Sequence, residues 1–149
     1  MEHSTHPMQQ SSAAPSQGTQ PITHYRQWIH PGGGAVSQEI TSCITACYEC
    51  AEACKSCADA CLGEAMVQDL VRCIRLDLDC AEICVVTGDL LLRQTDLNEP
   101  VVHDQLQACI TACQRCEAEC RNHAEAMEHC RICAEACRNC ALTCKALFG

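Results

Sequence analysis

The most regular apolar pattern in the chain lies in residues 43–61, where the same type of apolar residue recurs at alternating steps of four and three residues. This spacing places all members of the row on one face of an α-helix. The pattern predicts a helix with Ser37 as its N-cap that runs to about Leu62 and ends at Gly63. Sulfur occupies the seam that Leu and Ile normally fill, because every member of the row is a cysteine: Cys43, Cys47, Cys50, Cys54, Cys57 and Cys61.

A second helix is predicted from about Glu64 to Thr95, with a sparser row of thiols on its inward face. That face reads Met66, Leu70, Cys73, Asp77, Cys80, Cys84, Thr87 and Leu91. A second apolar stripe runs beside it from Val67 to Leu92. Such a helix has more apolar surface than one bundle core covers. A wide seam between two neighbouring helices and a subunit interface both explain the stripe, and we favour a homo-oligomer.

Two further rows of cysteines predict a third and a fourth helix. The third follows a turn at residues 96–100, where Pro100 suits the first helical turn. The phase of the pattern slips between Met127 and Cys133, and a continuous helix of about 45 residues would span roughly 68 Å. We therefore expect a short turn at residues 122–126 and a fourth helix from about Met127 to Leu147. The third helix carries Cys109, Cys113, Cys116 and Cys120, and the fourth carries Cys130, Cys133, Cys137, Cys140 and Cys144.

Four antiparallel helices joined by short turns predict an all-α fold, an up-down-up-down four-helix bundle with a cysteine-lined core. In this topology the turns near Gly63 and His123 share one end of the bundle. That end is expected to be the mouth of a tube of thiols and to hold the soft or borderline donors Met66, His123, Met127 and His129. The other end is expected to hold an apolar plug, formed by Ile40, Leu91, Leu106, Leu147 and Phe148.

Residues 1–36 are rich in Ser, Gln, Pro and Thr and show no period, which predicts a disordered tail ahead of a single domain at 37–149. The apolar side chains in the tail are candidates for docking on the bundle or on a neighbouring subunit: Tyr25, Trp28 and Ile29. The tail histidines are interpreted as solvated, with metal capture as the alternative: His3, His6, His24 and His30.

Composition narrows the class of protein. The chain has 149 residues and 18 cysteines, beyond the level that flags a disulfide or metal scaffold. Its net charge of −9 argues against a nucleic-acid partner, and no apolar run approaches the roughly 18 residues of a membrane span. The chain begins at Met without a basic and apolar leader, which indicates a cytoplasmic protein. In reducing cytosol such a cysteine pattern more often indicates metal or redox chemistry than structural disulfides.

The charge of a buried metal–thiolate site favours Cu(I) over other metals. Zinc prefers closed sets of four ligands, and four unshared thiolates leave a charge of −2, which is costly to bury. Cu(I) binds two or three thiolates that bridge neighbouring ions, so about one Cu(I) per cysteine leaves the core neutral. The thiols therefore predict storage of many Cu(I) ions without catalysis. A thiol redox or oxidant-buffering protein and a zinc-binding, metallothionein-like protein are the alternatives.

The repeated Cys-x3-Cys-x2-Cys motif, its closing Cys-x2-Cys-x3-Cys form and the His-Cys pair at 129–130 resemble the bacterial copper storage proteins over residues 37–149. The resemblance implies a four-helix bundle of the cytosolic branch, often a tetramer, in which all 18 cysteines bind copper. It also implies that copper enters at the end that bears Met66, His123, Met127 and His129. Each of these has an ordinary alternative, as a helix cap for the histidines and as core filler for the methionines.

Asp77 departs from the row of thiols by placing a carboxylate in the seam. Two interpretations remain open for it. It points inward and contributes to a polar or copper site, or it leans outward while Leu76 takes the inward place.

Overall fold

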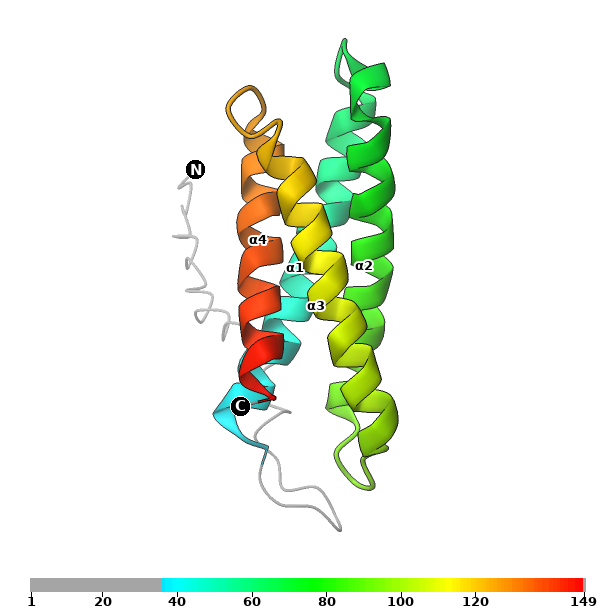
Figure 1. The fold of residues 1–149 in the computed structure, drawn as a ribbon, viewed down its shortest axis with the longest axis vertical. Coiled ribbons are helices and arrows are strands. Elements are labelled where there is room, and N and C mark those ends of the chain that lie inside the picture. Colours follow the sequence, from blue (N-terminus) through cyan, green and yellow to red (C-terminus); the bar gives the residue numbers. More distant parts are fainter. Residues whose placement is uncertain (1–35, 149) are drawn as a thin grey trace, which may run out of the picture.

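The computed structural model describes residues 36–148, which form four α-helices and one short 3-10 helix, with no strand in that range. Along the chain the elements are α1 (Gln38–Leu62), η2 (Val67–Leu70), α2 (Val71–Leu92), α3 (Glu99–Arg121) and α4 (Glu128–Ala146). Figure 1 shows that the long helices reverse direction at each turn. The predicted all-α, up-down-up-down bundle is therefore confirmed. The proposed tail, with its histidines and aromatic residues, lies outside the described residues apart from Val36.

The helices form a square in which α1 and α3 each pack against both α2 and α4. The turns at 63–66 and 122–126 lie at one end of this square, at the top of Figure 1. We call it the histidine end. The α2–α3 turn, the start of α1 and the end of α4 lie at the opposite end, which we call the apolar end.

The bounds of α1 follow from local capping, as the sequence predicts. The hydroxyl of Ser37 accepts a hydrogen bond of 3.2 Å from the backbone N–H of Ile40, which would otherwise lack a partner at the helix N-terminus. At the other end the N–H of Gly63 donates to the carbonyl of Ala60 over 3.1 Å. The helix therefore ends at Leu62.

The predicted second helix is too long at both ends. Hydrogen bonds from Glu64 to Cys61 and from Val67 to Glu64 close tight turns of the i-to-i+3 type, so the α-helix starts only at Val71. The chain needs these residues to reverse direction after α1. At the far end the side-chain amide of Gln94 donates to the carbonyl of Leu91 over 2.7 Å and satisfies one of the last carbonyls, and α2 ends at Leu92.

The turn between α3 and α4 lies where the phase slip predicts it. The N–H of His123 donates to Cys120, and the N–H of Met127 donates back to His123, so the chain turns within residues 122–126. Met127 then adopts extended backbone angles as the N-cap of α4. The change of spacing in the cysteine row thus correctly predicts this turn.

Sulfur forms the centre of the core. All 18 cysteines are buried, none more than 1% exposed, and small buried side chains lie among them: Ala46, Ala51, Ala58, Ala81, Ala134 and Ala141. Such small residues permit the close approach of neighbouring helices. Gly88 serves the same purpose, because a Cβ there would lie 2.9 Å from the ring of Tyr48 on α1. The core is therefore narrow, and its axis is lined by thiols.

The second apolar stripe of α2 is divided between core and surface. Ala81 is buried and Ile74 packs partly against the core, whereas Val71 and Leu78 remain exposed. Part of the stripe thus forms the wide seam between helices. None of the helices between residues 36 and 148 is long and apolar enough to span a bilayer.

Candidate metal site

The cysteine rows of the four helices meet along the bundle axis and form one continuous thiol column, defined as the Sγ atoms of all 18 cysteines. At the apolar end Cys43 and Cys144 lie 3.4 Å apart, and at the histidine end Cys57 and Cys130 lie 3.8 Å apart. Between them sulfur contacts of 3.6–4.0 Å link all four helices. A disulfide bond is about 2.05 Å long, and every cysteine is a free thiol.

Groups of four thiols close enough to hold one ion recur along the column, and they share members. One group is Cys47, Cys109, Cys140 and Cys144, and the next is Cys50, Cys84, Cys113 and Cys140. The following groups are Cys50, Cys54, Cys80 and Cys137, then Cys54, Cys116, Cys133 and Cys137. Because Cys50, Cys54, Cys137 and Cys140 each belong to two of these groups, the groups cannot all be filled without thiolates that bridge two ions. The donor set therefore fits a soft ion that accepts bridging sulfur.

Burial controls the protonation of two thiols at the histidine end, Cys130 and Cys61. It raises the pKa of Cys130 to about 11, and it also raises the pKa of Cys61. Loss of contact with water disfavours the thiolate, because the charge is then poorly solvated. Without metal these thiols therefore keep their protons at neutral pH, and each ion that binds must displace them.

Asp77 points into the column, so the outward-leaning interpretation is wrong. It is completely buried, and its Oδ1 lies 3.1 Å from the Sγ of Cys116 and 3.2 Å from that of Cys133. Burial, together with the neighbouring Cys133, raises its pKa to about 8. Leu76 instead lines a surface groove. The column thus contains one carboxyl group that is mainly protonated at neutral pH when no metal is bound.

Among the four predicted mouth residues, His129 has a ring nitrogen that faces three thiols. Its Nδ1 is 3.4 Å from the Sγ of Cys57, 3.6 Å from that of Cys130 and 4.0 Å from that of Cys61. These four residues form a possible ligand group. The opposite ring nitrogen, Nε2, lies 3.0 Å from the Oε1 of Glu64. The imidazole therefore bridges the thiol column and a carboxylate at the surface.

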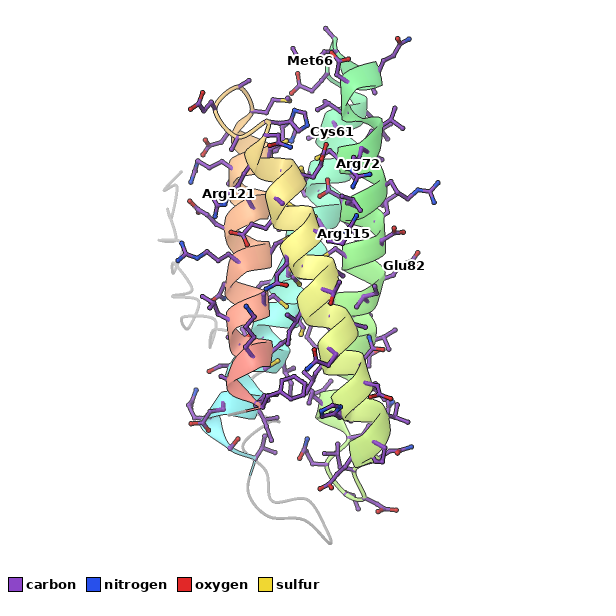
Figure 2. The ribbon with its side chains drawn as sticks, viewed as in Figure 1. Cys61, Met66, Arg72, Glu82, Arg115 and Arg121 are labelled. Atoms are coloured by element: carbon purple, nitrogen blue, oxygen red, sulfur yellow. The ribbon has the colours of Figure 1, made fainter. Side chains whose placement is uncertain are left out.

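The other three residues have different surroundings. Met127 is buried, 6% exposed, in the core cluster. The Nε2 of His123 faces the Oε1 of Glu119 at 3.3 Å, and Glu119 also pairs with Arg72. Met66 is 50% exposed, and Figure 2 shows it at the tip of the α1–α2 turn, beyond Cys61. The structure thus distinguishes His129, which contacts the thiols, from His123, which faces Glu119, and from Met66, which faces solvent.

The apolar end matches the predicted plug. Leu91 and Leu106 are buried, and Ile40 and Leu147 pack against the same cluster. Phe148 is more exposed, and its ring lies 4.9 Å from that of His103 in an edge-on contact. Hydrocarbon therefore closes this end of the column.

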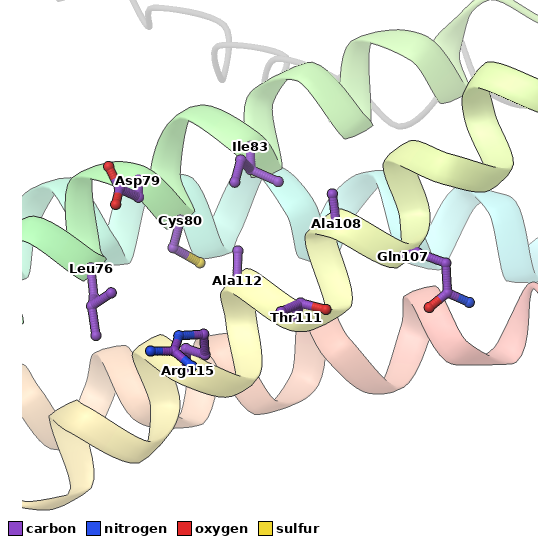
Figure 3. Close-up of a pocket in the computed structure, with 9 residues that line it drawn as sticks. All are labelled: Leu76, Asp79, Cys80, Ile83, Gln107, Ala108, Thr111, Ala112 and Arg115. Atoms are coloured by element: carbon purple, nitrogen blue, oxygen red, sulfur yellow. The ribbon is translucent and has the colours of Figure 1, made fainter.

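Two features of the site were not predicted from the sequence. The sequence pattern predicts Glu64 only as the start of a helix, although its position three residues after Cys61 is a signal for a place beside the thiols. A surface groove of about 450 Å³ also lies between α2 and α3, and Figure 3 shows Cys80 among its lining residues. The small Ala108 and Ala112 open this groove, and Asp79 and Arg115 line it as well.

Comparisons with known proteins agree with this geometry. The family model described as Csp, copper storage protein, matches residues 36–149. A comparison with curated proteins finds no match.

Solved structures of copper storage proteins are similar to the chain. One is a cytosolic copper storage protein from Streptomyces lividans, described during copper loading with five coppers. It is 49% identical with a TM-score of 0.73, and the match covers 74% of this chain and 92% of that chain. Ccsp from the same organism, loaded with 10 copper equivalents, is 45% identical with a TM-score of 0.78. The match covers 84% of this chain and 96% of Ccsp. A Cu(I)-bound copper storage protein, BsCsp3, is 36% identical with a TM-score of 0.66. That match covers 75% of this chain and 100% of BsCsp3.

Proposed function

The chain belongs to the copper storage protein family, and we propose that it stores multiple Cu(I) ions on the thiols along its bundle axis. The observation that carries this function is the continuity of the thiol column. Its 18 sulfur atoms are buried, unbonded to one another and supplied by all four helices. Storage needs no catalytic step, and the protein is proposed to be a binding protein rather than an enzyme.

Charge balance supports a capacity of about one Cu(I) per thiol. Each Cu(I) that replaces one thiol proton leaves the net charge of the column unchanged, so the dry core fills without accumulating charge. The shared groups of four supply the bridging thiolates that such a filling requires. Asp77 is proposed as an additional oxygen ligand, supported by its position among Cys116, Cys120 and Cys133.

The histidine end is proposed as the way in for copper. The contacts of His129 with three thiols support a role as the first ligand. Met127, His123 and Met66 lie on the same pair of turns and are proposed to assist the capture of the ion, Met66 from the surface. An ion that approaches from the apolar end would instead have to cross a layer of hydrocarbon.

Neither alternative function has comparable support. A thiol redox protein needs an accessible thiolate, and the most exposed cysteine, Cys57, is only 1% exposed. A zinc store would have to place Zn(II) in groups of four that share members, whereas a structural zinc site uses a closed set of four ligands. The shared members are Cys50, Cys54, Cys137 and Cys140.

Location and assembly are inferred from the relatives and the surface. The similarity to a protein described as cytosolic supports a cytoplasmic location. The exposed Val71, Leu78 and Val86 on α2 support a homo-oligomer, and a tetramer is favoured by the family resemblance.

The test is an anaerobic titration of reduced protein with Cu(I) against a competing chromogenic chelator. We expect uptake to continue to about one ion per cysteine, with no loss of free thiols after the copper is removed. Saturation at a few ions, or recovery of disulfides in place of thiols, would reject the storage function. A parallel titration with Zn(II) should neither match this capacity nor displace the bound copper.

A further inference from the structure

We propose that Glu64 is a positioning residue, which holds the imidazole of His129 in the one tautomer that can bind Cu(I) at the column. This inference rests on the proposed function and names a residue that acts through the first ligand. Glu64 lies on the α1–α2 turn and His129 on the first turn of α4, so the contact joins two segments 65 residues apart in the sequence.

The two nitrogens of the His129 ring face opposite chemistry. Nε2 lies 3.0 Å from the Oε1 of Glu64, and a carboxylate only accepts hydrogen bonds. The proton of the neutral ring must therefore sit on Nε2 and be donated to Glu64. The lone pair then remains on Nδ1, which faces the sulfur atoms of Cys57, Cys130 and Cys61. This is the form that a metal requires from histidine.

Without Glu64 the ring would be free to take the opposite tautomer. In that form Nδ1 carries the proton and donates it to a neighbouring sulfur, while the lone pair of Nε2 faces solvent. A copper ion that arrives from solvent would then meet no available lone pair on the column side of the ring. The contact thus selects both the protonation pattern and the orientation of the ring.

The backbone holds Glu64 in place for this contact. Its N–H donates to the carbonyl of Cys61 over 3.2 Å, and its own carbonyl accepts from Val67 over 3.2 Å. The carboxylate is 36% exposed and the imidazole 21% exposed, so both lie at the boundary between solvent and column. Glu64 is therefore fixed relative to the last thiol of α1, and it positions a ligand on α4.

His123 provides an internal contrast. Its Nε2 also faces a carboxylate, that of Glu119 at 3.3 Å. That carboxylate, however, is four residues away on the same chain segment and is also paired with Arg72. Within residues 36–148, the contacts between an imidazole and thiols are those of His129. The combination of a carboxylate on one nitrogen and thiols on the other is thus specific to His129 among these two histidines.

The test compares E64A and E64Q with E125A, which removes an exposed carboxylate from the other turn at the same end. Long-range ¹H–¹⁵N correlation spectra of reduced, metal-free protein identify the protonated nitrogen of His129. We expect a single Nε2–H tautomer in the wild type and in E125A. E64Q should retain it, because its amide oxygen still accepts the bond, whereas E64A should give a mixture of tautomers.

The second measurement is the stopped-flow rate of the first Cu(I) uptake. E64A should slow it on the order of 10-fold with unchanged capacity, and adding E64A to H129A should slow it no further. The inference is overturned if E64A matches E125A in both tautomer and rate, or if it slows the H129A protein as much as the wild type. If the wild type takes up no copper, storage itself fails, and the spectra alone then decide the role of Glu64.

Discussion

The two ends of the thiol column are built from the same cysteine rows but are closed by different chemistry. At the histidine end Cys57 and Cys130 adjoin an imidazole whose outer nitrogen meets a carboxylate. At the apolar end the core continues from Cys43 and Cys144 into buried aliphatic side chains such as Leu91 and Leu106. An ion therefore finds polar partners at one end and hydrocarbon at the other.

This difference shows that a uniform row of ligands does not by itself define a direction for loading. Cys43 and Cys57 have the same side chain and nearly the same burial, and they differ only in what surrounds them. Desolvation of a cation is costly unless ligands replace its water, so access is set by the groups beyond the last sulfur. The comparison can be tested by changing the two ends separately.

The largest expected effect is on stability at the apolar end. Leu91 is 2% exposed, and L91A should lower the free energy of unfolding of the metal-free protein by about 2–5 kcal/mol, because it leaves a cavity in a packed region. M66A at the histidine end is the matched change and should stay within about 0.5 kcal/mol, because Met66 is half exposed. Urea unfolding followed by circular dichroism measures both, and equal losses would contradict the assigned difference between the ends.

The next effect is on the rate of loading. H129A should slow the first Cu(I) uptake on the order of 100-fold, because it removes the proposed first ligand, which contacts three thiols at the surface boundary. H103A removes an exposed histidine from the apolar end and should leave the rate unchanged. Stopped-flow mixing with a Cu(I)–chelator complex measures both rates. A slower H103A protein would show that copper also enters at the apolar end.

The third expected effect is on how the stability of the metal-free protein depends on pH. Burial raises the pKa of Asp77 to about 8, far above its value in an unfolded chain, so the folded state binds the extra proton between these values. The stability that this proton provides is complete at about pH 4 and is lost as the pH rises toward 8, by at most about 1.4 kcal/mol per pH unit.

D77N carries no titrating group and should flatten this decline in the metal-free protein. Thermal unfolding at several pH values between 4 and 8 measures the slope. L91A serves as the control, because it should lower stability equally at every pH. Parallel slopes for D77N and the wild type would show that Asp77 does not carry the pH dependence.

Local signals predicted α1 more accurately than α2. Ser37 and Gly63 cap α1 through hydrogen bonds to residues three positions away. The residues near each cap are therefore enough to predict where α1 begins and ends. Residues 63–70 instead combine a turn with a 3-10 helix, and the apolar Val67 and Leu70 continue a helical period that the backbone does not follow. The helix predicted from the apolar period therefore runs through residues that form a turn. This turn is required only by the packing of α1 against α2.

The candidate site divides in the same way. The cysteine rows gave the thiol column, since a period of alternating four and three residues fixes one face of a helix wherever that helix packs. The same period placed Asp77 on the inward face but left a choice between Asp77 and Leu76, which their burial decides. The sequence does not predict the contact of Glu64 with His129, because the residues next to Glu64 do not indicate which helix its side chain meets.

The sequence by itself thus determined a four-helix bundle with sulfur at its centre, because helix periodicity and caps are properties of short segments. Only the tertiary structure decided that His129 contacts the thiols while His123 faces Glu119 and Met66 faces solvent. The position of His129 depends on contacts between residues far apart in the chain, since Cys57, Cys61 and Glu64 lie 65 to 72 residues before it. Such contacts are set by how the four helices pack together, and short-range patterns carry little trace of them.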